Sequence, residues 1–337
     1  MKGERLAFFD ALKLFAIYLV IWGHCINWYR LGQGENDVIY RIIYSFHMPL
    51  FMMISGYFSY SSIFLPARSF FKKKFRTLIY PCISWGVILW IIVEPTHSFH
   101  YGHNRYSFLG LFEDFYWLSD FWFLKSCFLC YCLLYLFAHS RIKKKIWVPV
   151  SLILSQACSP FSITFLYPCF LIGWLIKDNE KYKTVLLKHS FLLFILFCIL
   201  LYFWDFNSWQ KSHGLSSNIL NSEIETIIGT EGFRLFRLFI GIIGSLSVIS
   251  LFHYIFNTKI LRSSTLYCKW GAYTLETYIF QSIIIERILH IYINISTVYC
   301  PFLVLPIISF LILSLCVYIT ILLQRSLFLS KLLWGKN

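Results

Sequence analysis

Residues 6–29 read LAFFDALKLFAIYLVIWGHCINWY, a nearly continuous apolar run. A helix rises about 1.5 Å per residue, so this run is long enough to cross the ~30 Å hydrocarbon core of a bilayer. It is too long for the apolar core of a signal peptide, it contains Asp10 and Lys13, and it lacks a small-residue cleavage site. We therefore expect no cleaved leader here and predict a first transmembrane helix.

The composition extends this prediction to the whole chain. Of 337 residues, 58% are hydrophobic and 14% are charged, and the mean hydropathy is +0.65. A soluble protein carries charge on about a quarter of its residues. We predict an all-α, polytopic transmembrane helical bundle of about ten spans, forming a single integral-membrane domain over residues 1–337. The expected spans are 7–29, 38–60, 77–95, 119–138, 146–159, 161–176, 189–206, 234–256, 270–293 and 300–324.

The net charge of +14 is explained by membrane topology rather than by nucleic-acid binding. With the N-terminus inside, 21 of the 30 Lys and Arg residues lie in the even-numbered loops and the two tails, and only three lie in the odd-numbered loops. Cytoplasmic loops carry this excess in membrane proteins, where they face anionic headgroups. We expect both termini in the cytoplasm, a multi-pass location in the inner membrane, contacts with membrane lipids, and no nucleic-acid partner.

The spacing Cys127-x-x-Cys130-x-Cys132 is similar to that of metal ligands. These cysteines fall in an apolar run without a second cluster of ligands, and cysteine packs well as a small apolar side chain. We interpret them as packing residues and expect no metal.

Three ionisable residues in the first predicted span are functional candidates, because charge inside a bilayer is costly. Asp10 and Lys13 are three residues apart, so they are neighbours on one helical face and can neutralise each other. Lys13 and His24 are eleven residues apart, within about 20° of three full turns. This stripe suits a path from a cytoplasmic anionic ligand to an outer reaction centre. A packing stripe with a hydrogen-bonded histidine is the alternative.

The second predicted span contains His47-Met-Pro-Leu-Phe and then Ser55-Gly56-Tyr57. Pro49 removes a backbone hydrogen bond, and Gly56 allows a neighbouring helix to approach closely. By themselves these residues predict a kinked, tightly packed helix.

Together these motifs resemble the acyltransferase 3 family of integral-membrane acyltransferases, in its sugar O-acetylase branch. The basic residue eleven before a histidine, Lys13 and His24, is the most specific match. Further similar elements are the basic segment before Pro81, Trp122-Phe-Leu, and the segment from Gly271 to Gln281. Lys13 stands where arginine is commoner, and Gln281 stands where many members have histidine, so we assign Gln281 no catalytic role.

The resemblance implies transfer of an acyl group, usually acetyl from acetyl-CoA, to a hydroxyl of a cell-surface glycan or lipid-linked sugar. We expect His24 to act as general base, since a neutral imidazole accepts protons near working pH. Asp10 would orient Lys13. The donor phosphates would be held by Lys13, Lys74 and Arg76. The acceptor site would be lined by His47, Trp122, Arg234 and Glu286, with a structural role equally open for each.

Two other classes of protein fit the same residues. A transporter or flippase for a lipid-linked glycan would line its path with these charges, and a non-catalytic partner of a glycan-assembly complex would use them for packing. Some relatives append an extracytoplasmic esterase-like domain, which we do not find in this sequence. We therefore expect a one-domain transfer mechanism.

Overall fold

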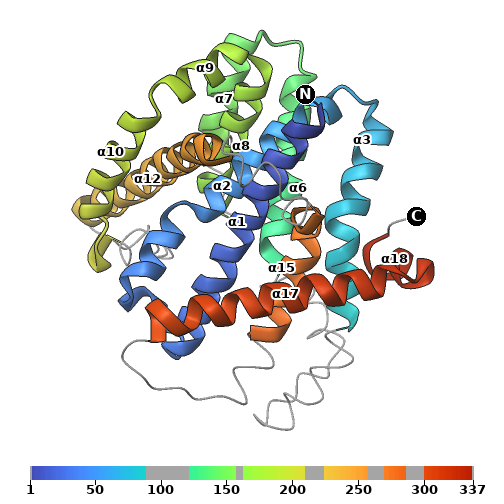
Figure 1. The fold of residues 1–337 in the computed structure, drawn as a ribbon. Coiled ribbons are helices and arrows are strands. Elements are labelled where there is room, and N and C mark those ends of the chain that lie inside the picture. The colour runs from blue at the N-terminus through green and yellow to red at the C-terminus, as the bar shows by residue number, and fades with distance from the viewer. Residues whose placement is uncertain are drawn as a thin grey trace. The chain divides into compact units, whose positions relative to one another are not determined.

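The computed structural model describes residues 2–88, 121–156, 162–208, 224–256, 269–285 and 300–335. All regular secondary structure in these ranges is helical, as predicted (Figure 1). The apolar runs form helices because every main-chain polar group of a membrane span needs a hydrogen-bond partner within the protein.

Four helices are long and apolar enough to cross a membrane. They span Ala7–Tyr29 within α1 (Lys2–Tyr29), Val38–Ile63, which is α2, Gly232–Phe256 within α12 (Ile224–Phe256), and Phe302–Gln324. The last contains α17 (Leu305–Gln324). These helices confirm four of the predicted spans, and α2 continues through Pro49.

The count of about ten spans is not confirmed. A fifth span is formed if α9 (Glu180–Lys188) and α10 (Ser190–Tyr202), which are bent by 69°, cross together. Three further predicted runs form shorter helices, namely α6 (Trp122–Ala138), α7 (Lys144–Gln156) and α8 (Ile163–Asp178). The predicted runs 77–95 and 270–293 lie partly outside the described residues.

The chain divides into two compact units. The first contains residues 1–54 and 175–317, and the second contains residues 55–174 and 318–337. The prediction of a single functional domain over the whole chain is a separate matter and stays a prediction.

In the first unit, α1 packs against α12 and against α15 (Thr274–Ser282). The Phe8 ring on α1 meets the rings of Phe252 and Phe256 on α12, with centroids 6.0 and 5.6 Å away. The helices α10 and α12 lie side by side (Figure 1). Ser245 on α12 also donates a hydrogen bond to the Phe46 carbonyl on α2, at 3.1 Å.

The second unit contains the end of α2, then α3 (Ala67–Lys74), the π-helical turn η2 (Phe75–Ile79), and α6, α7 and most of α8. Gly56 on α2 faces the Phe170 carbonyl so closely that a Cβ there would overlap it. This contact confirms the close helix approach predicted at Gly56. The Tyr131 hydroxyl on α6 donates to the Ser55 carbonyl at 3.1 Å and ties α6 to α2.

The C-terminal helix α18 (Leu327–Trp334) packs beside the helix that follows η2 in the same unit. The Tyr80 hydroxyl donates to the Leu332 carbonyl at 3.2 Å, and the Ser84 hydroxyl donates to the Leu333 carbonyl at 2.7 Å. These contacts agree with the prediction that the basic segment 68–76 and the C-terminal tail lie on the same side of a membrane. That this side is the cytoplasmic one stays a prediction.

Candidate functional site

The inner end of the predicted stripe is an ion pair on α1. The Lys13 ammonium lies 2.6 Å from a carboxylate oxygen of Asp10, and each side chain is 23% exposed. Spacing by three residues on a regular helix brings the two groups together. Both charges are thus compensated while the lysine stays accessible to a ligand.

The first turn of α1's apolar run also meets the start of α15. A Cβ at Gly271 would overlap the main chain of Asp10, so only glycine permits this approach. The contact holds the backbone of Asp10 and thereby the position of the ion pair. Glu276, in the first turn of α15, is buried with 1% exposure. Its buried carboxylate is a functional candidate that the sequence did not single out, although Glu276 lies within the segment from Gly271 to Gln281 that resembles the family.

His24 lies on the same unbroken helix as Lys13. Their separation of eleven positions corresponds to about 16 Å along the helix axis. The His24 ring faces Tyr44 of α2 edge-on, with ring centroids 6.4 Å apart. Gly23 allows this meeting, because a Cβ there would overlap the Tyr44 ring.

Tyr44 also contacts the second histidine of the predicted site. Its ring centroid lies 4.5 Å from that of His47, one turn further along α2. The Tyr44 ring also stacks on the Tyr40 ring, with centroids 3.9 Å apart. The fold therefore brings His24 and His47 together around Tyr44, which the sequence reasoning did not single out. A signal was present, since Tyr44 is three residues from His47 on the same helical face.

His47 is buried, and its Nδ1 lies 2.8 Å from the Ile43 carbonyl oxygen. A carbonyl only accepts hydrogen bonds, so Nδ1 carries the proton in this pairing. In the neutral ring Nε2 is then the accepting nitrogen. His47 can thus accept a hydrogen bond from a hydroxyl while α2 holds its orientation.

The structure describes two of the three remaining predicted acceptor residues. Arg234 lies partly buried on α12 of the first unit. Trp122 begins α6 in the second unit, where its ring meets that of Phe123 edge-on at 6.1 Å. Glu286 lies outside the described residues. Their roles at an acceptor site stay predictions.

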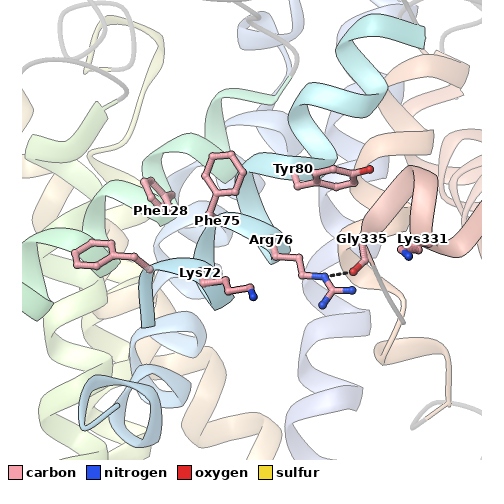
Figure 2. A pocket seen from close by; sticks show the side chains of 8 residues that line it. Lys72, Phe75, Arg76, Tyr80, Phe128, Lys331 and Gly335 are labelled. Carbon is pink, nitrogen blue, oxygen red and sulfur yellow. Dashed lines mark hydrogen bonds between the residues drawn. The ribbon is translucent and has the colours of Figure 1, made fainter. Parts of the chain in front are cut away.

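Lys74 and Arg76, predicted to bind the donor together, lie in the second unit on different sides of their helical segment. Two residues correspond to about 200° around a helix, so the spacing alone could have separated them. The Arg76 Nε donates to the Gly335 carbonyl (Figure 2). Lys74 is instead buried, and its Nζ lies 3.5 Å from the centre of the Tyr131 ring.

Lys74 lies outside the candidate spans, and its burial has an electrostatic consequence. The pKa of the Lys74 ammonium is lowered to about 8, mainly because burial desolvates the charge; Cys127 acts in the opposite direction, and the Lys73 charge adds to the lowering. The face of the Tyr131 ring favours the charged form. Lys74 therefore packs α3 against α6, and its predicted role in donor binding stays a prediction.

Across the described parts of the chain, no three His, Cys, Asp or Glu side chains come together as metal ligands do. Cys127 and Cys130 are buried in α6. The described site on α1 and α2 instead offers the Asp10–Lys13 ion pair and the His24 and His47 imidazoles beside Tyr44.

These features agree with a comparison of the sequence with protein families. Residues 6–321 match the acyltransferase 3 family model, described as an acyltransferase domain. The chain therefore belongs to the acyltransferase 3 family of membrane proteins.

Two curated relatives share the name nodulation protein NolL. The protein from Mesorhizobium japonicum is 25% identical over 226 residues, which cover 63% of this chain and 58% of the relative. The protein from Sinorhizobium fredii is 26% identical over 197 residues, covering 55% of this chain and 52% of the relative. The match thus spans little more than half the length of each relative. No solved structure is significantly similar to the chain.

Proposed function

We propose that this protein is a membrane O-acyltransferase that moves an acyl group, acetyl from acetyl-CoA, to a hydroxyl of a cell-surface glycan or lipid-linked sugar. The observation that carries the proposal is the ionisable stripe on α1, with the Asp10–Lys13 pair at one end and His24 beside Tyr44 at the other. Family membership supports the class of reaction. We place the reaction in the inner membrane, with a cytoplasmic donor and an outward acceptor.

In this proposal Lys13 binds the donor by its phosphates. An ammonium suits a nucleotide phosphate as a point charge. Asp10 holds the Lys13 ammonium in place, because the two side chains already form a close pair. About 16 Å separates Lys13 from His24 along the helix, a length that a pantetheine arm can bridge to bring the thioester near the histidine.

His24 acts as general base on the acceptor. The neutral imidazole takes the proton of the sugar hydroxyl as its oxygen attacks the thioester carbonyl. A tetrahedral intermediate forms and then expels the thiolate of coenzyme A, which takes the proton back from the imidazolium. The products are the sugar ester and free coenzyme A.

His47 serves the acceptor. With Nδ1 engaged by the Ile43 carbonyl, its Nε2 accepts a hydrogen bond from a second sugar hydroxyl, and Tyr44 packs against the ring. Trp122, Arg234 and Glu286 are further acceptor candidates. Lys74 and Arg76 are further candidates for donor binding.

The deciding experiment follows the acyl group. Purified protein in lipid nanodiscs is given acetyl-CoA labelled on the acetyl carbon, and release of coenzyme A is measured with and without a membrane extract that contains glycan acceptors. We expect acceptor-dependent release and labelled glycan, both lost in His24→Ala. A glycan flippase or a non-catalytic partner would release no coenzyme A in either protein. Mass analysis of the labelled glycan then identifies the sugar and the acyl group.

A further inference from the structure

The second unit contains a pocket of about 600 Å³ whose walls come from α3, η2, α6 and α18. This volume is within the range of about 300–1,000 Å³ that is usual for small-molecule sites. Of the described residues proposed for the transfer reaction, only the donor-binding candidate Arg76 lines it, so whether the pocket takes the acyl donor or another ligand is a separate question.

Three basic side chains line this pocket, Lys72, Arg76 and Lys331, and no acidic residue is found among the described residues of its lining. Lys72 and Arg76 are four residues apart and therefore share a helical face. Lys331 reaches them from α18, because hydrogen bonds from Arg76 to Gly335 and from Tyr80 to Leu332 hold that helix alongside. Three positive charges at one pocket attract an anionic ligand.

The rest of the lining is aromatic, with Phe71, Phe75 and Phe128 in its walls. Figure 2 shows the rings of Phe75 and Phe128 on one side and the charged ends of Lys72, Arg76 and Lys331 on the other. The pocket is thus amphipathic and matches a ligand that has one anionic end and one hydrocarbon end.

The surroundings of the pocket point to the bilayer as the source of that ligand. On α18, Leu327 is 78% exposed and Phe328 is 73% exposed, and Phe75 at the pocket is 45% exposed. A helix with exposed apolar residues and a lysine lies well at the boundary between headgroups and acyl chains. At this depth phospholipids are the most concentrated amphiphiles.

We propose that this pocket binds an anionic phospholipid of the membrane leaflet that it faces. The lipid phosphate lies among Lys72, Arg76 and Lys331, and an acyl chain lies along Phe75 and Phe128. The pantetheine arm of an acyl donor fits these walls less well, because its two amides would lose water against phenyl rings. This site goes beyond the proposed transfer reaction and does not depend on it.

The test is lipid binding by native mass spectrometry on delipidated, full-length protein. The probes are phosphatidylglycerol and phosphatidylcholine with the same acyl chains. The variant is Lys72→Gln with Lys331→Gln, and the matched control is Lys143→Gln with Lys145→Gln, two exposed lysines outside the pocket. Thermal unfolding in detergent checks that all proteins are folded.

We expect wild type to bind phosphatidylglycerol at least tenfold more tightly than phosphatidylcholine. The pocket variant should bind phosphatidylglycerol about thirtyfold more weakly, about fivefold for each lysine removed, and the control should bind as wild type does. Equal binding of the two lipids by wild type, or an equal loss in the control variant, would overturn the proposal.

Two competitors separate the lipid from other anions. Glycerol 3-phosphate, the headgroup without chains, should not displace phosphatidylglycerol, because it cannot occupy the aromatic wall. Coenzyme A should not displace it either. Displacement by glycerol 3-phosphate would reduce the site to a simple anion site. Displacement by coenzyme A, with its own affinity lowered in the pocket variant, would assign the pocket to the acyl donor.

Discussion

The proposed donor site needs the positive charge of Lys13, so substitutions that keep or remove this charge should have different effects. Lys13→Arg should keep most of the donor affinity, because it retains the charge at that position. Lys13→Ala should weaken donor binding by about tenfold to a hundredfold, as expected for a charge-assisted hydrogen bond of about 1.5–3 kcal/mol. Calorimetric titration with coenzyme A measures both. Unchanged affinity in the alanine variant would contradict the assignment.

His24 should be needed for the chemical step but not for donor binding, since it lies about three turns from Lys13. His24→Gln should lower the transfer rate by about 10²–10⁴-fold, the usual contribution of a general base, with donor affinity nearly unchanged. The measurement is acetyl transfer under saturating donor.

The control is His139→Gln, because His139 is exposed just after α6, in the other unit, and its Nδ1 pairs with a main-chain carbonyl. It should transfer at the wild-type rate. If His24→Gln does the same, His24 is a packing residue that glutamine replaces through its hydrogen bond.

The burial of Lys74 should make the stability of the folded protein depend on pH. Burial lowers its pKa in the folded protein to about 8 from the ordinary value of 10.5. Between these values the unfolded chain binds more protons, so stability rises with pH by at most about 1.4 kcal/mol per pH unit and levels off above 10.5. Below pH 8 both states are protonated and the cost of burying the charge is constant.

The measurement compares the thermal midpoints of wild type and Lys74→Met between pH 7 and pH 10.5 in detergent. The thermal midpoint of wild type should rise relative to that of Lys74→Met as pH rises, since methionine has no proton to lose. The thermal midpoint of wild type should not rise in this way relative to that of Lys73→Met, a control at an exposed neighbouring position. A constant difference between wild type and Lys74→Met would mean that the Lys74 pKa is unshifted.

At the scale of elements, close helix approaches at glycines organise both units. Gly271→Ala should push α15 away from the main chain of Asp10. Overpacking of this kind costs about 1–3 kcal/mol. Because Asp10 orients Lys13, we expect weaker donor binding together with a lower thermal midpoint, measured by calorimetric titration and by unfolding in detergent.

Two other glycines serve as comparisons for Gly271. Gly56→Ala would meet the Phe170 carbonyl and should lower the thermal midpoint by a similar amount. Gly232→Ala on α12 has no atom within 4 Å and should be neutral or slightly stabilising. A neutral Gly271→Ala would show that α15 can move away without cost.

At the scale of the whole molecule, topology is the open prediction. With the native cysteines replaced, Gln33→Cys in the turn after α1 should react with a membrane-impermeant maleimide from outside, because the basic residues of the loops predict that this turn faces outward. Lys143→Cys, before α7, should react only after permeabilisation. Both positions are exposed in the fold, so access depends on the side of the membrane. Labelling of Lys143→Cys from outside would contradict the predicted cytoplasmic location of the termini.

The sequence by itself determined the class of protein, the helical fold, four of the spans and the Asp10–Lys13 pair. Hydrophobic length and helical spacing are local properties, and a bilayer makes them decisive because unpaired backbone cannot cross it. It also predicted His24 and Lys13 on one helix. The sequence did not predict which of the shorter apolar runs form helices long enough to cross a membrane.

Only the tertiary structure decided which distant residues meet. It placed Tyr44 beside His24 and His47, set Gly271 against Asp10, and divided the basic segment so that Lys74 is buried while Arg76 meets Gly335. It also carried Lys331 to the pocket of Lys72 and Arg76. These contacts depend on how helices far apart in the sequence pack, and helix packing is set by the shapes of the two facing surfaces, which spacing within one helix does not contain.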